Sequence, residues 1–131
     1  MTHASHWTAS DGTQLFYRYD DFTDPWKTAP TLLMLHSAMS SAKRFHSMVP
    51  GLAKHYRVIR LDSRGHGESE VPASHVPHDK DRLERDVIAL LDKLGIEKTH
   101  ILAGAAGGYT AQLPARAFSR RARVSRREAW R

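Results

Sequence analysis

Three short apolar runs, separated by helical patterns, most constrain how this chain of 131 residues can fold. Each run is bounded by polar or turn residues, as expected of a strand that is buried on both faces. The runs are TLLMLH at 31–36, YRVIRLD at 56–62 and THILAG at 99–104. Because strands that alternate with helices form right-handed βαβ units, we predict an α/β fold with a mostly parallel sheet and helices on both faces.

The segments between these runs supply the two crossover helices. Ser40 or Ser41 is expected to cap a helix that continues to about Lys54, and Pro50 implies a bend or a late start within it. A second helix is expected over 79–94, where leucine and valine recur at helical spacing.

The first twenty residues carry a hairpin signal. Two extended runs, HWTAS and TQLFYRYD, flank Asp11-Gly12, a pair that favours a tight turn. This hairpin predicts leading antiparallel strands at one edge of the sheet.

Composition narrows the class of protein. The chain is 40% hydrophobic and 26% charged, which is typical of a folded domain. It has no cysteine, and this excludes disulfides and thiolate chemistry. The start shows no signal-peptide pattern, and no apolar run approaches the roughly 20 residues that span a bilayer. We therefore expect a cytoplasmic protein without membrane contact.

Three landmarks follow one another along the chain: LHSAMSS after the first apolar run, DSRGHGES at 62–69, and the strand–turn–helix pattern HILAGAAGGYTA. Together they resemble the α/β-hydrolase fold family, and HYRVIRLDSRGHGESEVP is most similar to its enol-lactonase branch. The resemblance covers about residues 5–112. It implies the N-terminal part of that fold and, as activity, hydrolysis of small esters, lactones or related carbonyl compounds.

The family's nucleophilic serine stands in a G-x-S-x-G turn between strand and helix. Here these positions read Gly104, Ala105, Ala106, Gly107 and Gly108, which puts Ala106 where the serine belongs. A shifted alignment instead deletes the serine between Ala105 and Ala106. In both alignments the turn has no hydroxyl, thiol or carboxylate, so we predict that it holds no catalytic residue.

The other triad members are also missing from this chain. The family orders them Ser, Asp or Glu, then His. None of the nine histidines follows His100, and Glu128 is the single acid after the turn. The resemblance therefore predicts that the chain is truncated and inactive as it stands.

The resemblance also implies an oxyanion hole built from backbone N–H groups. The candidates are Ser37 or Ala38 on one side and Gly107 on the other, with Ala106 replacing Gly107 in the shifted alignment. Two interpretations stay open, because these residues are equally consistent with ordinary strand-to-helix turns.

Within 62–69 the resemblance implies a structural turn that Asp62, Arg64, Gly65 and Gly67 hold in place. We expect His66 to belong to this turn rather than to act as a base.

The remaining histidines do not indicate a metal site. His36 ends a buried strand, and we expect its ring to donate to a backbone carbonyl. His75 and His78 have a spacing that can ligate zinc, but no third ligand has a matching spacing. We predict neither a metal nor another cofactor.

The excess positive charge lies at one end of the chain. Residues 114–131 contain seven arginines and one acid, whereas basic and acidic residues balance over 1–113. The sudden onset favours a shifted reading frame, or a disordered tail, after a partial domain over 1–113. The alternative is a non-catalytic binding module whose tail contacts nucleic acid or acidic partners; nucleic acid is the less favoured partner.

A fold that ended near residue 113 would leave the strand at the third apolar run on the edge of the sheet. Edge strands present unpaired N–H and C=O groups. We therefore predict self-association through Thr99–Gly104.

Overall fold

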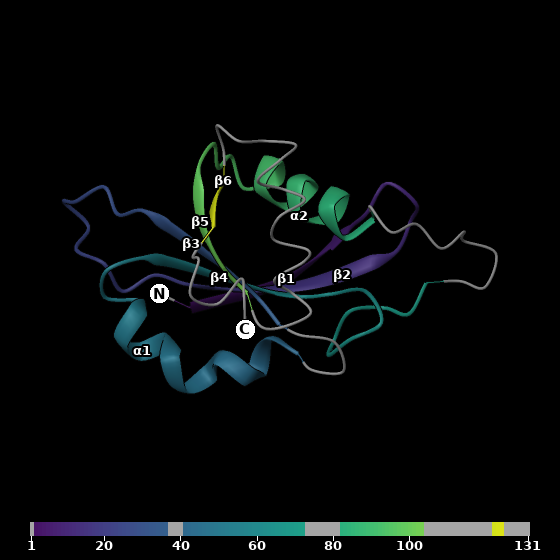
Figure 1. Ribbon diagram of the computed structural model, residues 1–131, viewed down its shortest axis with the longest axis horizontal. Coiled ribbons are helices and arrows are strands. Elements are labelled where there is room, and N and C mark those ends of the chain that lie inside the picture. Colours follow the sequence, from purple (N-terminus) through teal and green to yellow (C-terminus); the bar gives the residue numbers. More distant parts are fainter. Residues whose placement is uncertain (1, 37–40, 73–81, 104–121, 125–131) are drawn as a thin grey trace.

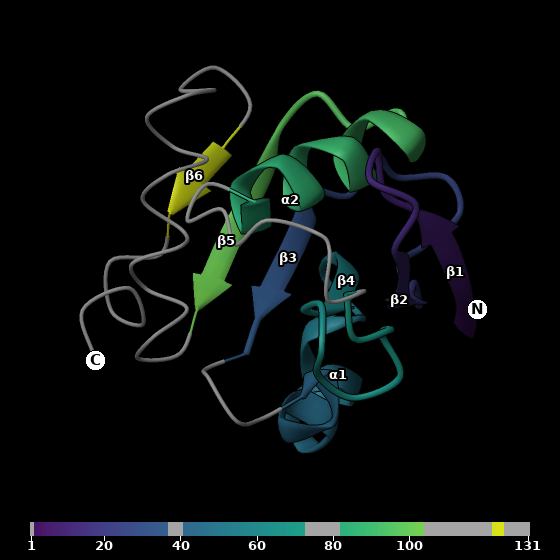
Figure 2. The same cartoon turned by 90° about the vertical axis from the view of Figure 1, so that its right-hand side faces the viewer.

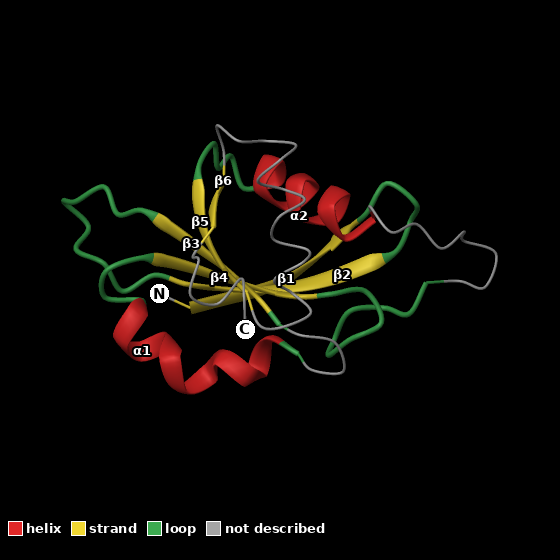
Figure 3. Ribbon diagram, viewed as in Figure 1, coloured by secondary structure: helices red, strands yellow, loops and turns green. Residues whose placement is uncertain are grey.

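The computed structural model describes residues 2–36, 41–72, 82–103 and 122–124. They form a six-stranded mixed sheet in the order β1-β2-β4-β3-β5-β6. Figure 1 shows α2 on one face of this sheet and α1 on the other, and Figure 3 shows the same layers coloured by type. The predicted α/β class, with helices on both faces, is confirmed.

The leading hairpin consists of β1 (Thr2–Thr8) and β2 (Gln14–Asp20), which pair antiparallel. Its turn lies at Asp11-Gly12, as the sequence predicts. Gly12 has a φ of +88°, a conformation that glycine adopts without strain. The Asp11 carboxylate accepts a hydrogen bond from the Thr13 N–H at 3.1 Å. β2 then pairs antiparallel with β4, so the hairpin adds an antiparallel edge to the sheet.

The three apolar runs form the parallel centre of the sheet. They are β3 (Thr31–Leu35), β4 (Arg57–Asp62) and β5 (Thr99–Ala103), and β3 lies between the other two. Figure 2 shows β5 and β3 side by side, pointing the same way. Successive side chains on these strands point to opposite faces. Leu33 and Ile59 join the core under α2, whereas Leu32 and Val58 join the core under α1.

The first crossover differs from the single helix that the sequence predicts. It consists of a 3-10 helix, η1 (Ala42–Met48), followed by one α-helical turn, α1 (Val49–Leu52). Ser41 is the N-cap, and its side chain accepts a hydrogen bond from the Lys43 N–H at 3.3 Å. Pro50 has no N–H to donate to an earlier carbonyl, so the α-helical turn begins beside it.

The second crossover is α2 (Arg82–Lys93), with Val87, Leu90 and Leu91 buried against the sheet. Its predicted start, residue 79, lies outside the described residues. At its end Gly95 has a φ of +69°, and the Ile96 N–H reaches back to the Leu91 carbonyl at 2.9 Å. This is a Schellman cap, in which glycine takes the left-handed position.

The predicted exposed edge at 99–104 is wrong over Thr99–Ile101. A short strand, β6 (Ala122–Val124), pairs parallel with these residues. The backbone groups that we expected to be unpaired therefore find partners within the same chain. β6 lies inside the range 114–131 that the sequence assigns to a tail; the boundary at 113, the shifted frame and self-association stay predictions.

Candidate functional site

The carboxyl ends of β3, β4 and β5 lie side by side because these strands are parallel and adjacent. In open α/β sheets, ligands bind outside these ends. His36 follows β3 and Ser63 follows β4, so both residues lie at this edge. We take this edge of the sheet as the candidate site.

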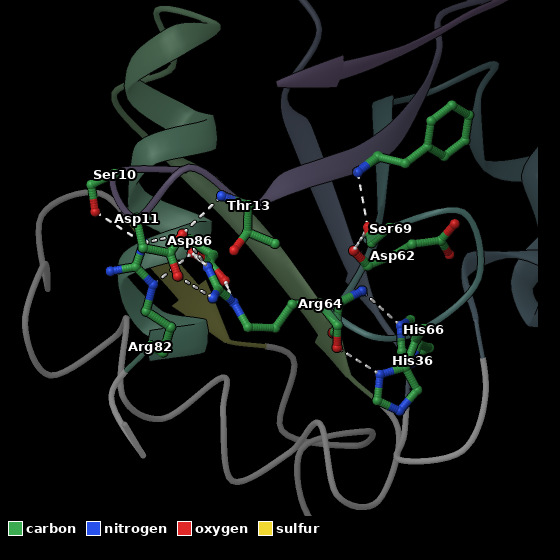
Figure 4. A network of polar contacts seen from close by, with 12 residues as sticks. Ser10, Asp11, Thr13, His36, Asp62, Arg64, His66, Ser69, Arg82 and Asp86 are labelled. Carbon is green, nitrogen blue, oxygen red and sulfur yellow. Dashed lines mark hydrogen bonds and ion pairs between the residues drawn. The ribbon is translucent and has the colours of Figure 1, made fainter. Parts of the chain in front are cut away.

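Two histidines meet at the candidate site (Figure 4). His36 is buried, and its Nε2 accepts a hydrogen bond from the Ser63 backbone N–H at 3.0 Å. Since this nitrogen accepts, the neutral ring carries its proton on Nδ1. The ring thus accepts from a backbone N–H at Nε2, and its expected donation to a backbone carbonyl stays a prediction. The centroids of the His36 and His66 rings are 5.1 Å apart.

His66 contacts the turn that contains it. Its Nδ1 lies 3.1 Å from the Arg64 carbonyl oxygen, which can only accept, so Nδ1 donates. The ring therefore contacts both this turn and His36. This arrangement gives His66 a position within the turn.

The Asp62 carboxylate, at the end of β4, joins three segments. Its Oδ1 accepts from the Ala42 N–H at 2.7 Å, at the start of η1. Its Oδ2 accepts from the Glu68 N–H at 3.1 Å and from Arg18 Nη1 at 3.4 Å. Asp62 is 1% exposed, so these donors replace water around the charge. The carboxylate thereby holds Ala42, four residues after Ala38, against the end of β4.

The two glycines of the predicted structural turn differ in their surroundings. Both have positive φ, +77° at Gly65 and +52° at Gly67. A Cβ on Gly65 would meet nothing within 4 Å, whereas a Cβ on Gly67 would overlap the Asp62 carboxyl group. Gly67 is therefore needed for close approach as well as for its backbone conformation.

The Arg64 side chain extends toward the face of the sheet that α2 covers, and it binds two carboxylates there, as the sticks in Figure 4 show. It forms a bidentate pair with Asp86 of α2, at 2.8 and 2.9 Å, and contacts Asp11 of the hairpin turn at 2.6 Å. Arg82 also reaches Asp11, at 3.2 Å, and Asp86, at 3.5 Å. We call Asp11, Arg64, Arg82 and Asp86 the α2-side cluster.

The pKa values of the two acids in the α2-side cluster are shifted in opposite directions. The hydrogen bond from Arg64 holds the pKa of Asp11 well below its usual value. Burial raises the pKa of Asp86, and the charge of Arg64 opposes that shift. Burial disfavours the charge on Arg64, but Asp86 and Asp11 outweigh it and raise the pKa of the guanidinium. Arg64 and Asp11 therefore stay charged near neutral pH.

Sequence reasoning missed Arg82 and Asp86. Asp86 lies four residues before the buried Leu90, on the face of α2 that packs against the sheet. An acid on that apolar stripe is the signal that would have indicated a buried partner.

Several predicted site residues lie outside the described residues. These are the nucleophile position Ala106, the oxyanion candidates Ser37, Ala38 and Gly107, the turn residues Gly104, Ala105 and Gly108, and the histidine pair His75 and His78. Within the described ranges, no three His, Asp or Glu side chains gather as metal ligands would. No helix in the described part of the chain is long and apolar enough to cross a membrane.

Comparison with known proteins finds several curated relatives. The chain is 34% identical over 85 residues to 3-oxoadipate enol-lactonase 1 of Acinetobacter baylyi, covering 65% of this chain and 31% of the relative. It is 36% identical over 111 residues to a non-heme chloroperoxidase of Streptomyces lividans, covering 84% and 38%. The chain thus spans about a third of the length of these relatives.

Solved structures agree with the sequence relatives. A hydrolase from Pseudomonas aeruginosa superposes with a TM-score of 0.82 at 34% identity, over 93% of this chain and 44% of that one. The enol-lactonase from Burkholderia xenovorans LB400 gives 0.78 at 34% identity, over 92% and 45%. A profile of the alpha/beta hydrolase fold matches residues 30–125. This chain belongs to the α/β-hydrolase fold family.

Proposed function

We propose that the chain corresponds to the first part of a hydrolase domain for small esters, lactones or related carbonyl compounds, and that by itself it does not hydrolyse them. The substrate class is supported by the family and by relatives such as the enol-lactonases. A cytoplasmic location and a small carbonyl compound as partner belong to the same proposal.

One observation carries the proposal. The sequence directly after β5 reads Gly-Ala-Ala-Gly-Gly, where the family has G-x-S-x-G. β5 lies beside and parallel to β3, whose end bears His36, so β5 also leads to the candidate site. Alanine has no electron pair to attack a carbonyl carbon, and removal of a nucleophile reduces a triad enzyme to residual catalysis.

The contacts of Ser63 and Ser69 in the 62–69 turn support the proposal. Ser63 contributes its N–H to His36, and Ser69 accepts from the Phe16 N–H at 2.9 Å while its own hydroxyl donates to the Asp62 carbonyl. A nucleophilic serine needs a base that takes its proton. The ring nitrogen of His36 that faces Ser63 already accepts a backbone N–H.

The test compares hydrolysis of p-nitrophenyl butyrate and a small lactone by the purified chain and by Ala106→Val and Gly107→Val. We expect any rate above buffer to be the same in all three proteins, because the turn takes no part in it. A rate that falls at least tenfold in either variant would place the working site in this turn and overturn the proposal.

A variant with the serine restored, Ala106→Ser, gives a second readout. We expect no gain in rate, because the chain contains no histidine after His100 to accept the proton. A gain of tenfold or more would show that another group activates the serine, and would contradict the proposed inactivity.

A further inference from the structure

A cavity lies away from the candidate site, at the C-terminal end of β2. It has a volume of about 560 Å³, which is within the usual range for small-molecule sites, about 300–1,000 Å³. Asp20, at its floor, pairs with Val58 at the amino end of β4, whereas the candidate site is at the carboxyl ends. The cavity is therefore separate from the hydrolase site.

The floor of the cavity is a buried ion pair. Arg60 Nη2 lies 3.0 Å from Asp20 Oδ2, and the two side chains are 6% and 5% exposed. Thr2 Oγ1 donates to the other carboxylate oxygen at 3.0 Å. Both oxygens of Asp20 thus have partners, and the charges at the floor cancel. An entering ligand meets a preorganised and neutral base.

The walls are apolar and partly open to solvent. Phe22 is 56% exposed although it is large and apolar. Its backbone N–H donates to the Ala53 carbonyl at 3.0 Å, so the segment that carries it is attached to the end of α1. Val49 and Pro50 of α1 form the facing wall. An apolar group that enters between these walls removes their surface from water.

The rim carries one positively charged side chain, Lys54. Lys54 and the neighbouring His46 line the cavity and are exposed. Neither forms an ion pair with any acid in the part of the chain that the structure describes, whereas Asp20 is already neutralised by Arg60. An anionic group that reaches Lys54 therefore meets an uncompensated cation next to apolar walls.

We propose that this cavity binds a small amphipathic carboxylate, with its apolar body between Phe22 and α1 and its carboxylate at Lys54. The uncompensated Lys54 cation favours ligands with a negative charge, and the apolar walls favour ligands with an apolar body. A simple anion such as acetate uses the cation alone and an uncharged analogue uses the walls alone, so each is expected to bind more weakly than the amphipathic acid.

The test titrates 4-phenylbutyrate, 4-phenylbutan-1-ol and acetate into the purified chain and follows backbone amide shifts by NMR. We expect 4-phenylbutyrate to shift the amides of Phe22 and Lys54, to leave Ser63 unchanged, and to bind at least threefold more tightly than either other compound. Shifts at Ser63 instead would place the acid at the candidate hydrolase site and overturn the proposal, as would equal binding of the alcohol.

Two variants measure separately what the apolar walls and the Lys54 charge contribute to binding. Lys54→Gln is expected to weaken the binding of 4-phenylbutyrate about threefold and to leave the binding of the alcohol unchanged. Phe22→Ala is expected to weaken both about tenfold. Lys43→Gln, an exposed lysine on η1 that does not line the cavity, is the matched control and is expected to change neither. Unchanged affinity for the acid in Lys54→Gln, with an unchanged melting temperature, would contradict the proposal.

Discussion

Asp62 and Arg64 are two residues apart in one turn, yet they act on opposite faces of the sheet. The Asp62 carboxylate accepts hydrogen bonds from two backbone N–H groups on the η1 face, and Arg18 makes a longer third contact with it. Arg64 pairs with side-chain carboxylates on the α2 face, where Arg82 reaches the same two acids. Loss of Asp62 leaves buried donors without an acceptor, whereas loss of Arg64 leaves acids that still have a cation nearby.

The largest effect is expected for Asp62→Ala. The buried N–H of Ala42 and the part-buried N–H of Glu68 lose their acceptor, and Arg18 loses one partner. We expect a loss of about 4 kcal/mol in the free energy of unfolding. Urea denaturation followed by circular dichroism measures this loss. A loss below about 1 kcal/mol would show that the carboxylate does not organise this face.

The next effect is expected for Gly67→Ala, with Gly65→Ala as its matched control. Both changes force a Cβ onto a positive φ, at a cost of about 1 kcal/mol. Only at Gly67 does the new atom overlap the Asp62 carboxyl group, and we expect a total of about 3 kcal/mol there. The same denaturation experiment compares the two variants. Equal losses would contradict the close approach of Gly67 to Asp62.

On the α2 face, Arg64→Met is expected to lower the free energy of unfolding by about 2 kcal/mol. This is less than for Asp62→Ala, because Arg82 lies 3.2 Å from Asp11 and continues to compensate part of the acidic charge. The double variant Arg64→Met/Arg82→Met tests that reason. We expect it to lose more than the sum of the two single variants, and additive losses would show that the two arginines act independently.

The smallest effect is a pH dependence at Asp11. Its pKa is lower in the folded chain than the ordinary 3.8, so its charge stabilises the fold above that value, and the contribution is lost as the pH falls through the folded pKa. Asp11→Asn is therefore expected to be about 1 kcal/mol less stable than the original chain at pH 6 and to approach it below pH 3. Unfolding midpoints across this range check the sign, and a constant difference would contradict it.

Much of the fold could be predicted because its signals are local. The Asp11-Gly12 turn, the three apolar runs and the helix before Gly95 all appear in the structure at nearly the expected bounds. The pairing of β6 with β5 could not be predicted, because Ala122–Val124 has no apolar run or turn signal of its own. Its placement depends on a partner strand that offers free backbone groups.

The polar contacts were harder to predict than the strands. The resemblance points to Asp62 and Arg64, but not to the distant acids that Arg64 contacts, because Asp11 and Asp86 lie 53 and 22 residues away in sequence. The Arg60–Asp20 pair is a similar case. A charged residue inside a run that is otherwise apolar indicates a buried partner, yet the partner's identity depends on strand order.

The central claim is that the turn after β5 holds no nucleophile. The most direct measurement is the intact mass of the purified chain after incubation with a fluorophosphonate probe, which reacts with activated serines. We expect no added mass, because Ala106 stands at the nucleophile position and no later histidine is present to activate a serine. One probe molecule bound covalently to a serine would contradict the claim.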